Sequence, residues 1–185
     1  NISVKLSEKN TFGERVEVLR VKGSGWDLDT ISDKGLPSLD LNRIRELRNL
    51  KKLKDEDLVN FQRSSLLDSS SPNPSIETLL HAFLPYKFIE HTHSTPFLYL
   101  ANVASSEKII EEIFGQEVAV VPYIKPGFDL AKLAASIHDS KSGLKGLFLQ
   151  HHGHFAWGET AKQSYDNLIL QTIKVEKWIN KQKKP

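Results

Sequence analysis

Apolar and polar residues alternate along several short stretches of the chain, a pattern typical of half-buried β-strands. In residues 1–6, isoleucine, valine and leucine alternate with serine and lysine. Residues 15–21 alternate in a similar way and follow turn-forming residues at 8–13, so they predict the second strand of a hairpin. More continuously apolar runs predict three further strands, at 87–93, 118–123 and 146–150.

Apolar positions three and four residues apart predict helices between these strands. Leucine or isoleucine recurs every third residue in 41–53, and small apolar residues dominate 129–138. Asp55 and Ser75 are placed to cap the helices that follow them. The predicted helices are 41–53, 55–67, 75–83, 96–103, 106–114, 129–138 and 159–180.

Helices that follow and precede strands along a chain predict a three-layer α/β domain. At 185 residues the chain suits one domain and is long enough to bury a sizeable core. The serine- and proline-rich stretch 68–75 could separate two domains, but the apolar runs on either side are too short for two cores. We therefore expect a single domain over residues 1–185, with 68–75 as an internal loop.

Composition and charge narrow the classes of function. The formal net charge of +2 makes no case for nucleic acid or for an acidic membrane surface as a partner. No apolar run approaches the length that spans a bilayer and no signal peptide opens the chain, so we expect a cytoplasmic protein by default. The chain contains no cysteine, so any metal site must use His, Asp or Glu.

Two clusters contain most of the seven histidines, and each follows an apolar run. The first is His91-Thr92-His93 and the second is His151-His152-Gly153-His154. Two histidines separated by one residue point to the same side of a strand. A third from a neighbouring strand end would complete three ligands with an open position, the composition of a catalytic zinc site. Spacing alone leaves open which histidine of the second cluster would serve, or whether all are buried and hydrogen-bonded without metal.

Two other features have more than one interpretation. Gly23-Ser24-Gly25 suits a loop whose backbone N–H groups approach an anion, but it also suits a plain turn. Glu77 and His81 are four residues apart on a predicted helix and would share a face. Taken alone, Glu77 fits an ordinary glutamate on a helix surface.

The order of these motifs resembles the class II aldolase/adducin family. The segments that carry the resemblance are Pro74-Ser75-Ile76-Glu77 with His81, His91-Thr92-His93, Val121-Pro122-Tyr123, Lys125-Pro126-Gly127, Gln150-His151-His152-Gly153 and Gly158-Glu159-Thr160-Ala161. Residues 22–28 and 77–85 are similar to the aldolase part of bifunctional proteins. These proteins join a rhamnulose-1-phosphate-aldolase-like domain to a C-terminal short-chain dehydrogenase. The chain would be a fragment of such a protein or a stand-alone relative.

The resemblance implies an α/β/α sandwich with a central, mostly antiparallel or mixed sheet. It implies that the protein forms a homotetramer and binds a small sugar phosphate. His91, His93 and His152 match the histidines that bind Zn²⁺ or another divalent metal, and Glu77 matches the catalytic acid/base. The residues that match the phosphate-binding segments are Asn1, Ser3, Ser24, Gly25 and Ser75.

The implied reaction is the cleavage of a ketose 1-phosphate to dihydroxyacetone phosphate and an aldehyde. Zinc would act as a Lewis acid that stabilises the enediolate, and Glu77 would move the protons. Contacts to the phosphate would position the reacting carbons. Two alternatives stay open: a sugar-phosphate epimerase or dehydratase that uses the same metal, and a non-catalytic adducin-like module.

Overall fold

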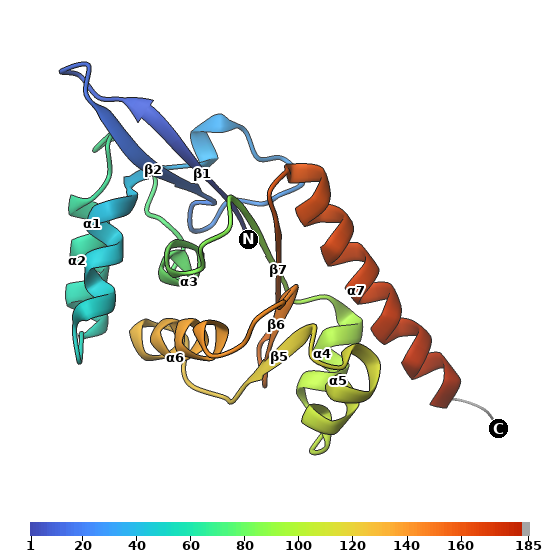
Figure 1. The fold of residues 1–185 in the computed structure, drawn as a ribbon. Coiled ribbons are helices and arrows are strands. Elements are labelled where there is room, and N and C mark those ends of the chain that lie inside the picture. The colour runs from blue at the N-terminus through green and yellow to red at the C-terminus, as the bar shows by residue number, and fades with distance from the viewer. Residues whose placement is uncertain (183–185) are drawn as a thin grey trace. The chain divides into compact units, whose positions relative to one another are not determined.

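The computed structural model describes residues 1–182, which fall into two units (Figure 1). Unit 1 contains residues 1–87 and 125–135. Unit 2 contains residues 88–124 and the described residues from 136 onward. The single domain over residues 1–185 stays a prediction, and its last residues, 183–185, lie outside the described residues.

Unit 1 is built on an antiparallel sheet of three strands. They are β1 (Ile2–Lys9), β2 (Arg15–Val21) and β3 (Ser38–Asp40), with β2 paired to both of the others. The predicted hairpin is confirmed, but β1 runs three residues beyond its predicted end. Lys9 still pairs with Arg15, because a strand can continue through polar residues where both of its faces meet solvent.

The helices of unit 1 are shorter than their apolar periodicity predicts. They are α1 (Leu41–Glu46), α2 (Asp55–Ser64) and α3 (Thr78–Phe83), with 3₁₀ turns η1 (Asp33–Gly35) and η2 (Leu47–Asn49). The predicted helix 41–53 tightens into η2, whose i, i+3 pattern also suits a leucine at every third position. Asp55 is the first residue of α2 and not its cap, which is Lys54.

Unit 2 is built on a mixed sheet of four strands. In order of pairing they are β4 (Phe88–Thr92), β7 (Gly153–Gly158), β6 (Gly146–Leu149) and β5 (Val118–Val121). Strand β7 runs antiparallel to both of its neighbours, β4 and β6, and β5 runs parallel to β6. The predicted α/β class with a mostly antiparallel or mixed sheet is therefore confirmed.

Two short strands, β3 and β7, were not predicted from the sequence. All six residues of β7 are buried, so the segment lacks the polar–apolar alternation that marks a half-buried strand. It also begins and ends with glycine, which is more typical of loops. A tight turn after β6 leads directly into β7, and the pairing of β7 determines where His152 and His154 lie.

Helices pack against the sheet of unit 2 around a phenylalanine-rich core. They are α4 (Thr95–Ala101), α5 (Ser106–Phe114) and α7 (Ala161–Gln182), whereas α6 (Phe128–Asp139) continues from unit 1 into unit 2. Phe97, Phe114 and Phe148 are almost fully buried in this core. Each buried phenylalanine stabilises the fold by about 1.5–3 kcal/mol. Within residues 1–182 no helix has both the length and the apolar character needed to cross a membrane.

Candidate metal centre

His91 belongs to unit 2 and is the last but one residue of β4. It pairs with Phe155 of β7, and the two rings stack with centroids 4.2 Å apart. Its side chain is 2% exposed. The Nδ1 atom lies 2.9 Å from the backbone carbonyl oxygen of His154. A carbonyl can only accept, so Nδ1 carries the hydrogen and Nε2 keeps its lone pair.

His93 follows the end of β4 and reaches the same side as His91, as the H-x-H spacing predicts. The ring centroids of the two histidines are 4.7 Å apart. Their Nε2 atoms lie 2.9 Å from each other. At this distance two lone pairs repel, so either one nitrogen donates a hydrogen to the other or both nitrogens share a cation.

His152 reaches these two rings from the tight turn between β6 and β7. Three backbone hydrogen bonds hold this turn: from Gln150 to Val121, from His151 to Ala101 and from His152 to Leu149. His151 adopts a left-handed conformation with φ of 55°, which allows the chain to reverse within the turn. The His152 ring centroid lies 5.0 Å from that of His91 and 4.9 Å from that of His93.

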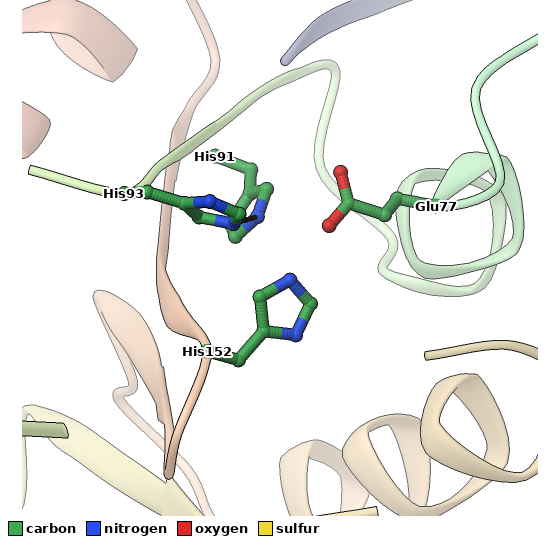
Figure 2. A group of neighbouring side chains, drawn as sticks. All are labelled: Glu77, His91, His93 and His152. Carbon is green, nitrogen blue, oxygen red and sulfur yellow. Dashed lines mark hydrogen bonds between the residues drawn. The ribbon is translucent and has the colours of Figure 1, made fainter. Parts of the chain in front are cut away.

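The structure thus brings together the three histidines that the sequence singled out, as Figure 2 shows. One ring nitrogen from each of His91, His93 and His152 lies within 4.8 Å of the others. Three neutral imidazoles form a common ligand set for zinc, and the second contact of His91 fixes its tautomer as in known metal sites. The residues therefore fit a divalent metal, whose binding stays a prediction.

The neighbouring histidines take other roles. His154 is fully buried, and its ring stacks on Phe97 with centroids 3.7 Å apart. Burial, with a smaller effect of the neighbouring His91, lowers the pKa of His154 to about 3, so this ring is neutral at physiological pH. His151 is exposed and its ring meets the edge of Tyr123 at 5.7 Å. Geometry therefore distinguishes His152 from the two candidates that spacing could not separate from it.

Gly153 contributes to this centre by having no side chain, a role that we did not predict. A Cβ atom built on it would lie 2.5 Å from the carbonyl oxygen of Thr92 and 2.7 Å from Cδ2 of His93. Both distances are shorter than van der Waals contact, so β7 can approach β4 this closely only with glycine here. The glycine that follows His152 was visible in the sequence, but the strand facing it was not.

Glu77 belongs to unit 1, where it precedes α3 and does not lie within it. It is the N-cap residue and is half-buried. The expectation that both residues lie within one helix is therefore wrong for Glu77, although the His81 N–H still donates to the Glu77 carbonyl at 3.3 Å. The His81 ring is fully buried with Nδ1 2.8 Å from the Ser3 hydroxyl, and the Asn1 amide donates to Glu77 Oε2 at 3.3 Å. The helix starts late because Ser75 accepts hydrogen bonds from the N–H groups of Glu77 and Thr78 and forms a turn.

The predicted phosphate-binding residues come from three segments that meet in unit 1. Backbone hydrogen bonds join Lys22 to Ile2, Ser24 to Asn73 and Ser75 to Lys22. The Asn1 amide donates to the Ser75 hydroxyl at 2.7 Å. Ser24 and Gly25 are exposed, and Gly25 has φ of 78°, which glycine adopts without strain. Ser3 differs from the others because it is 7% exposed and its hydroxyl already contacts His81.

Comparison with known proteins places this architecture in a family. Residues 1–172 match the Class II Aldolase and Adducin N-terminal domain. Over 180 residues the chain is 38% identical to a Bacillus subtilis (strain 168) protein named Uncharacterized oxidoreductase YuxG. That match covers 97% of this chain but 26% of YuxG, so the chain spans about a quarter of that relative.

Solved structures agree with the sequence match. The N-terminal class II aldolase domain of a conserved protein from Thermoplasma acidophilum superposes with a TM-score of 0.90 at 38% identity, covering 96% of this chain and 82% of that one. A sugar-phosphate aldolase from Thermotoga maritima shares the fold, with a TM-score of 0.65 at 18% identity over 97% of this chain and 83% of its own. By sequence and by fold, the chain belongs to the class II aldolase/adducin family.

Proposed function

We propose that this chain is a metal-dependent aldolase domain that cleaves a ketose 1-phosphate, similar to rhamnulose 1-phosphate, into dihydroxyacetone phosphate and an aldehyde. The observation that carries the proposal is the convergence of His91, His93 and His152, with one ring nitrogen of each within 4.8 Å of the others. A non-catalytic module has no need for such a set. Membership of the class II aldolase/adducin family supports the same reaction class.

The three histidines are proposed to hold the metal, which we take to be Zn²⁺. When bound, the metal would act as a Lewis acid on the substrate carbonyl and adjacent hydroxyl. His91 has the most constrained position, because its ring is stacked on Phe155 and its Nδ1 hydrogen is donated to His154. Neutral imidazoles leave the positive charge of the metal undiminished.

Glu77 is proposed as the acid/base. Its carboxylate would take the proton from the hydroxyl that becomes the aldehyde, while the electrons of the broken carbon–carbon bond pass toward the ketone oxygen. The protonated carboxyl would then return a proton to the carbon of the dihydroxyacetone phosphate fragment that had been bonded to the aldehyde carbon. The Asn1 amide, 3.3 Å from Oε2 of Glu77, would hold the carboxylate in one orientation.

The substrate phosphate is proposed to bind where the three segments of unit 1 meet. Exposed Ser24 and Gly25 supply a hydroxyl and backbone N–H groups, and Asn1 and Ser75 supply polar side chains. The Ser3 hydroxyl contacts His81 Nδ1, so it could donate to the phosphate if it accepts the hydrogen of His81 in that contact. Binding energy from the phosphate would position the reacting carbons.

Two further proposals concern the whole protein. We propose that the chain assembles into a homotetramer, as the resemblance to this family implies. We also propose that it is the aldolase part of a longer protein with a short-chain dehydrogenase. The match to about a quarter of YuxG, a protein named as an oxidoreductase, supports the second proposal.

The deciding experiment is a retro-aldol assay over a panel of ketose 1-phosphates, with and without a chelator. We expect at least one substrate to release dihydroxyacetone phosphate in a reaction that chelation abolishes. Glu77→Gln should keep its metal content and lose at least about a hundredfold in kcat. Wild-type activity in Glu77→Gln would refute its role. An isomerised or dehydrated product without dihydroxyacetone phosphate would establish the epimerase or dehydratase alternative.

A further inference from the structure

The side chain of Lys22 bends toward the loop that follows it in unit 1. Its ammonium donates to the carbonyl oxygen of Gly23 at 3.1 Å and to that of Trp26 at 2.5 Å. These two carbonyls flank Ser24 and Gly25, which match the phosphate-binding segments of the family. The ammonium therefore lies against the short loop that is proposed to hold the substrate phosphate.

The backbone of Lys22 joins the other two segments of this region. Its N–H donates to the carbonyl of Ile2 at 3.0 Å, and its carbonyl accepts from the N–H of Ser75 at 3.2 Å. Asn1 precedes Ile2 in the chain, and its amide donates to the Ser75 hydroxyl. Lys22 thus connects all three segments, although it is not one of the residues that match the phosphate site.

The loop contains backbone donors that no other group uses. Within residues 1–182, the N–H groups of Gly25, Trp26 and Asp27 form no hydrogen bond. Successive N–H groups of this kind suit an anion. Across a trans peptide the C=O of one residue and the N–H of the next point in opposite directions. The contact from Lys22 to the Trp26 carbonyl therefore leaves the N–H of Asp27 pointing away from the ammonium, toward the other side of the loop.

The charges in this region show what the ammonium can add. A phosphate monoester carries about 1.5 to 2 negative charges at pH 7. Among the residues that the structure describes, Lys22 forms no ion pair, and its two partners are neutral carbonyls. The carboxylate of Asp27 is exposed and accepts from the N–H of Asp29 instead. No charged side chain occurs among the residues that match the phosphate site, which are Asn1, Ser3, Ser24, Gly25 and Ser75.

We propose that Lys22 is a positioning residue for the substrate phosphate, and that its charge makes the site prefer a phosphorylated ketose to the same sugar without phosphate. Lys22 holds the loop with two carbonyls on one side, and its positive charge acts through the loop on the anion. That separation is shorter than the screening length of about 8 Å at physiological ionic strength. The inference rests on the proposed function, because it concerns the phosphate part of that substrate.

Titration with inorganic phosphate tests the role of the charge without any reaction. A chelator in the buffer prevents phosphate from binding to a metal at the three histidines. Lys22→Gln keeps an amide that can donate to a carbonyl but removes the charge, whereas Lys22→Arg keeps the charge. We expect Kd for phosphate to rise at least about tenfold in Lys22→Gln and to change less than about threefold in Lys22→Arg.

Lys9→Gln is the matched control for the loss of one positive charge. Lys9 is exposed at the end of β1 that lies opposite Ile2, about 20 Å or more along the strand. This variant should bind phosphate as wild type does, and all variants should share the wild-type circular dichroism. Wild-type affinity in Lys22→Gln would overturn the proposal. An equal loss in Lys22→Arg and Lys22→Gln would also overturn it, because the loop would then need the shape of lysine and not its charge.

Substrate preference distinguishes this role from a purely structural one. With zinc present, we compare kcat/KM for a ketose 1-phosphate with kcat/KM for the same ketose without phosphate. In Lys22→Gln the ratio should fall at least about tenfold, through a higher KM for the phosphorylated sugar, and in Lys9→Gln it should not change. An equal fall for both sugars would mean that Lys22 only maintains the fold, and would overturn the proposal.

The two experiments also separate this inference from the proposed reaction. If Lys22→Gln binds phosphate weakly but the wild type cleaves no ketose 1-phosphate, the role of Lys22 stands and the proposed reaction is refuted. If the wild type cleaves its substrate and Lys22→Gln keeps the same preference for phosphate, the inference alone is refuted. A wild type that binds no phosphate would refute the phosphate site and this inference together.

Discussion

At the scale of single residues, Gly153 shows how a missing side chain can determine a candidate metal centre. A Cβ atom at this position would press on the carbonyl of Thr92 and on the ring of His93. We expect Gly153→Ala to lower zinc affinity by about 10- to 100-fold, because it moves one ligand ring relative to the others. Isothermal titration of the apoprotein with zinc measures this change.

Gly158→Ala is the matched control at the other end of β7. Its Cβ would lie 2.6 Å from the backbone nitrogen of Ser164, a clash of the same severity away from the histidines. Both variants should lose about 1–3 kcal/mol in free energy of unfolding. Only Gly153→Ala should lose zinc affinity, and equal zinc affinity in the two variants would show that Gly153 has only a structural role.

The buried ring of His154 makes stability depend on pH. Its pKa is lowered by burial to about 3, below the usual value of 6.5, so the unfolded chain binds its proton more readily. The contribution of the neutral ring is complete above pH 6.5 and is lost as the pH falls toward 3. Between pH 7.5 and pH 5 we expect His154 to account for about 2 kcal/mol of lost stability.

His154→Phe isolates this contribution, since phenylalanine can still stack on Phe97. Urea denaturation at pH 7.5 and pH 5 should show a smaller loss of stability in the variant than in wild type. An equal loss in both proteins would mean that other groups, such as the four exposed or half-buried histidines, cause the acid sensitivity.

At the scale of elements, the turn between β6 and β7 places His152 through the unusual backbone of His151. A left-handed φ of 55° costs a side-chain-bearing residue about 1 kcal/mol, and more when the residue is β-branched. We expect His151→Gly to fold with a stability within about 0.5 kcal/mol of wild type. His151→Val should lose a further 1–2 kcal/mol or so by urea denaturation.

Zinc affinity separates the two adjacent histidines of this turn. His151→Gly should bind zinc as wild type does, because the His151 ring faces Tyr123 and lies outside the group of three. His152→Gly should bind weakly or not at all. A loss of zinc in His151→Gly would mean that the ligand assignment is wrong.

The elements also show which sequence patterns are informative. Apolar and polar residues alternate clearly in the strand 15–21, and apolar residues recur with helical spacing in 106–114. Both elements lie where they were predicted. Strand β7 was missed because complete burial removes alternation. Helix α3 starts late because Ser75 forms a turn instead of a cap, and two hydrogen-bonding options of one serine look identical in sequence.

At the scale of the whole molecule, a bound metal should stabilise the fold. All three proposed ligands belong to unit 2, and the unfolded chain has no preformed site. Zinc at about 100 times its dissociation constant should add about 2.7 kcal/mol of stability, which raises Tm by roughly 5–10 °C. His93→Ala should show no such shift in a thermal melt, whereas Glu77→Gln should retain it. A wild-type Tm that changes neither when zinc is added nor when a chelator is added would contradict the metal site.

The sequence by itself determined the α/β class, most of the secondary structure and the family, because periodicity and motif order are properties of the chain alone. It also singled out His91 and His93, since one intervening residue in a strand always places two side chains on the same side. The family resemblance also named His152, but only the tertiary structure shows that its ring lies beside those of His91 and His93 and that the His154 ring is buried against Phe97. That choice depends on the pairing of β7 with β4, in which residues about sixty positions apart meet, and such contacts leave no periodic pattern in the sequence.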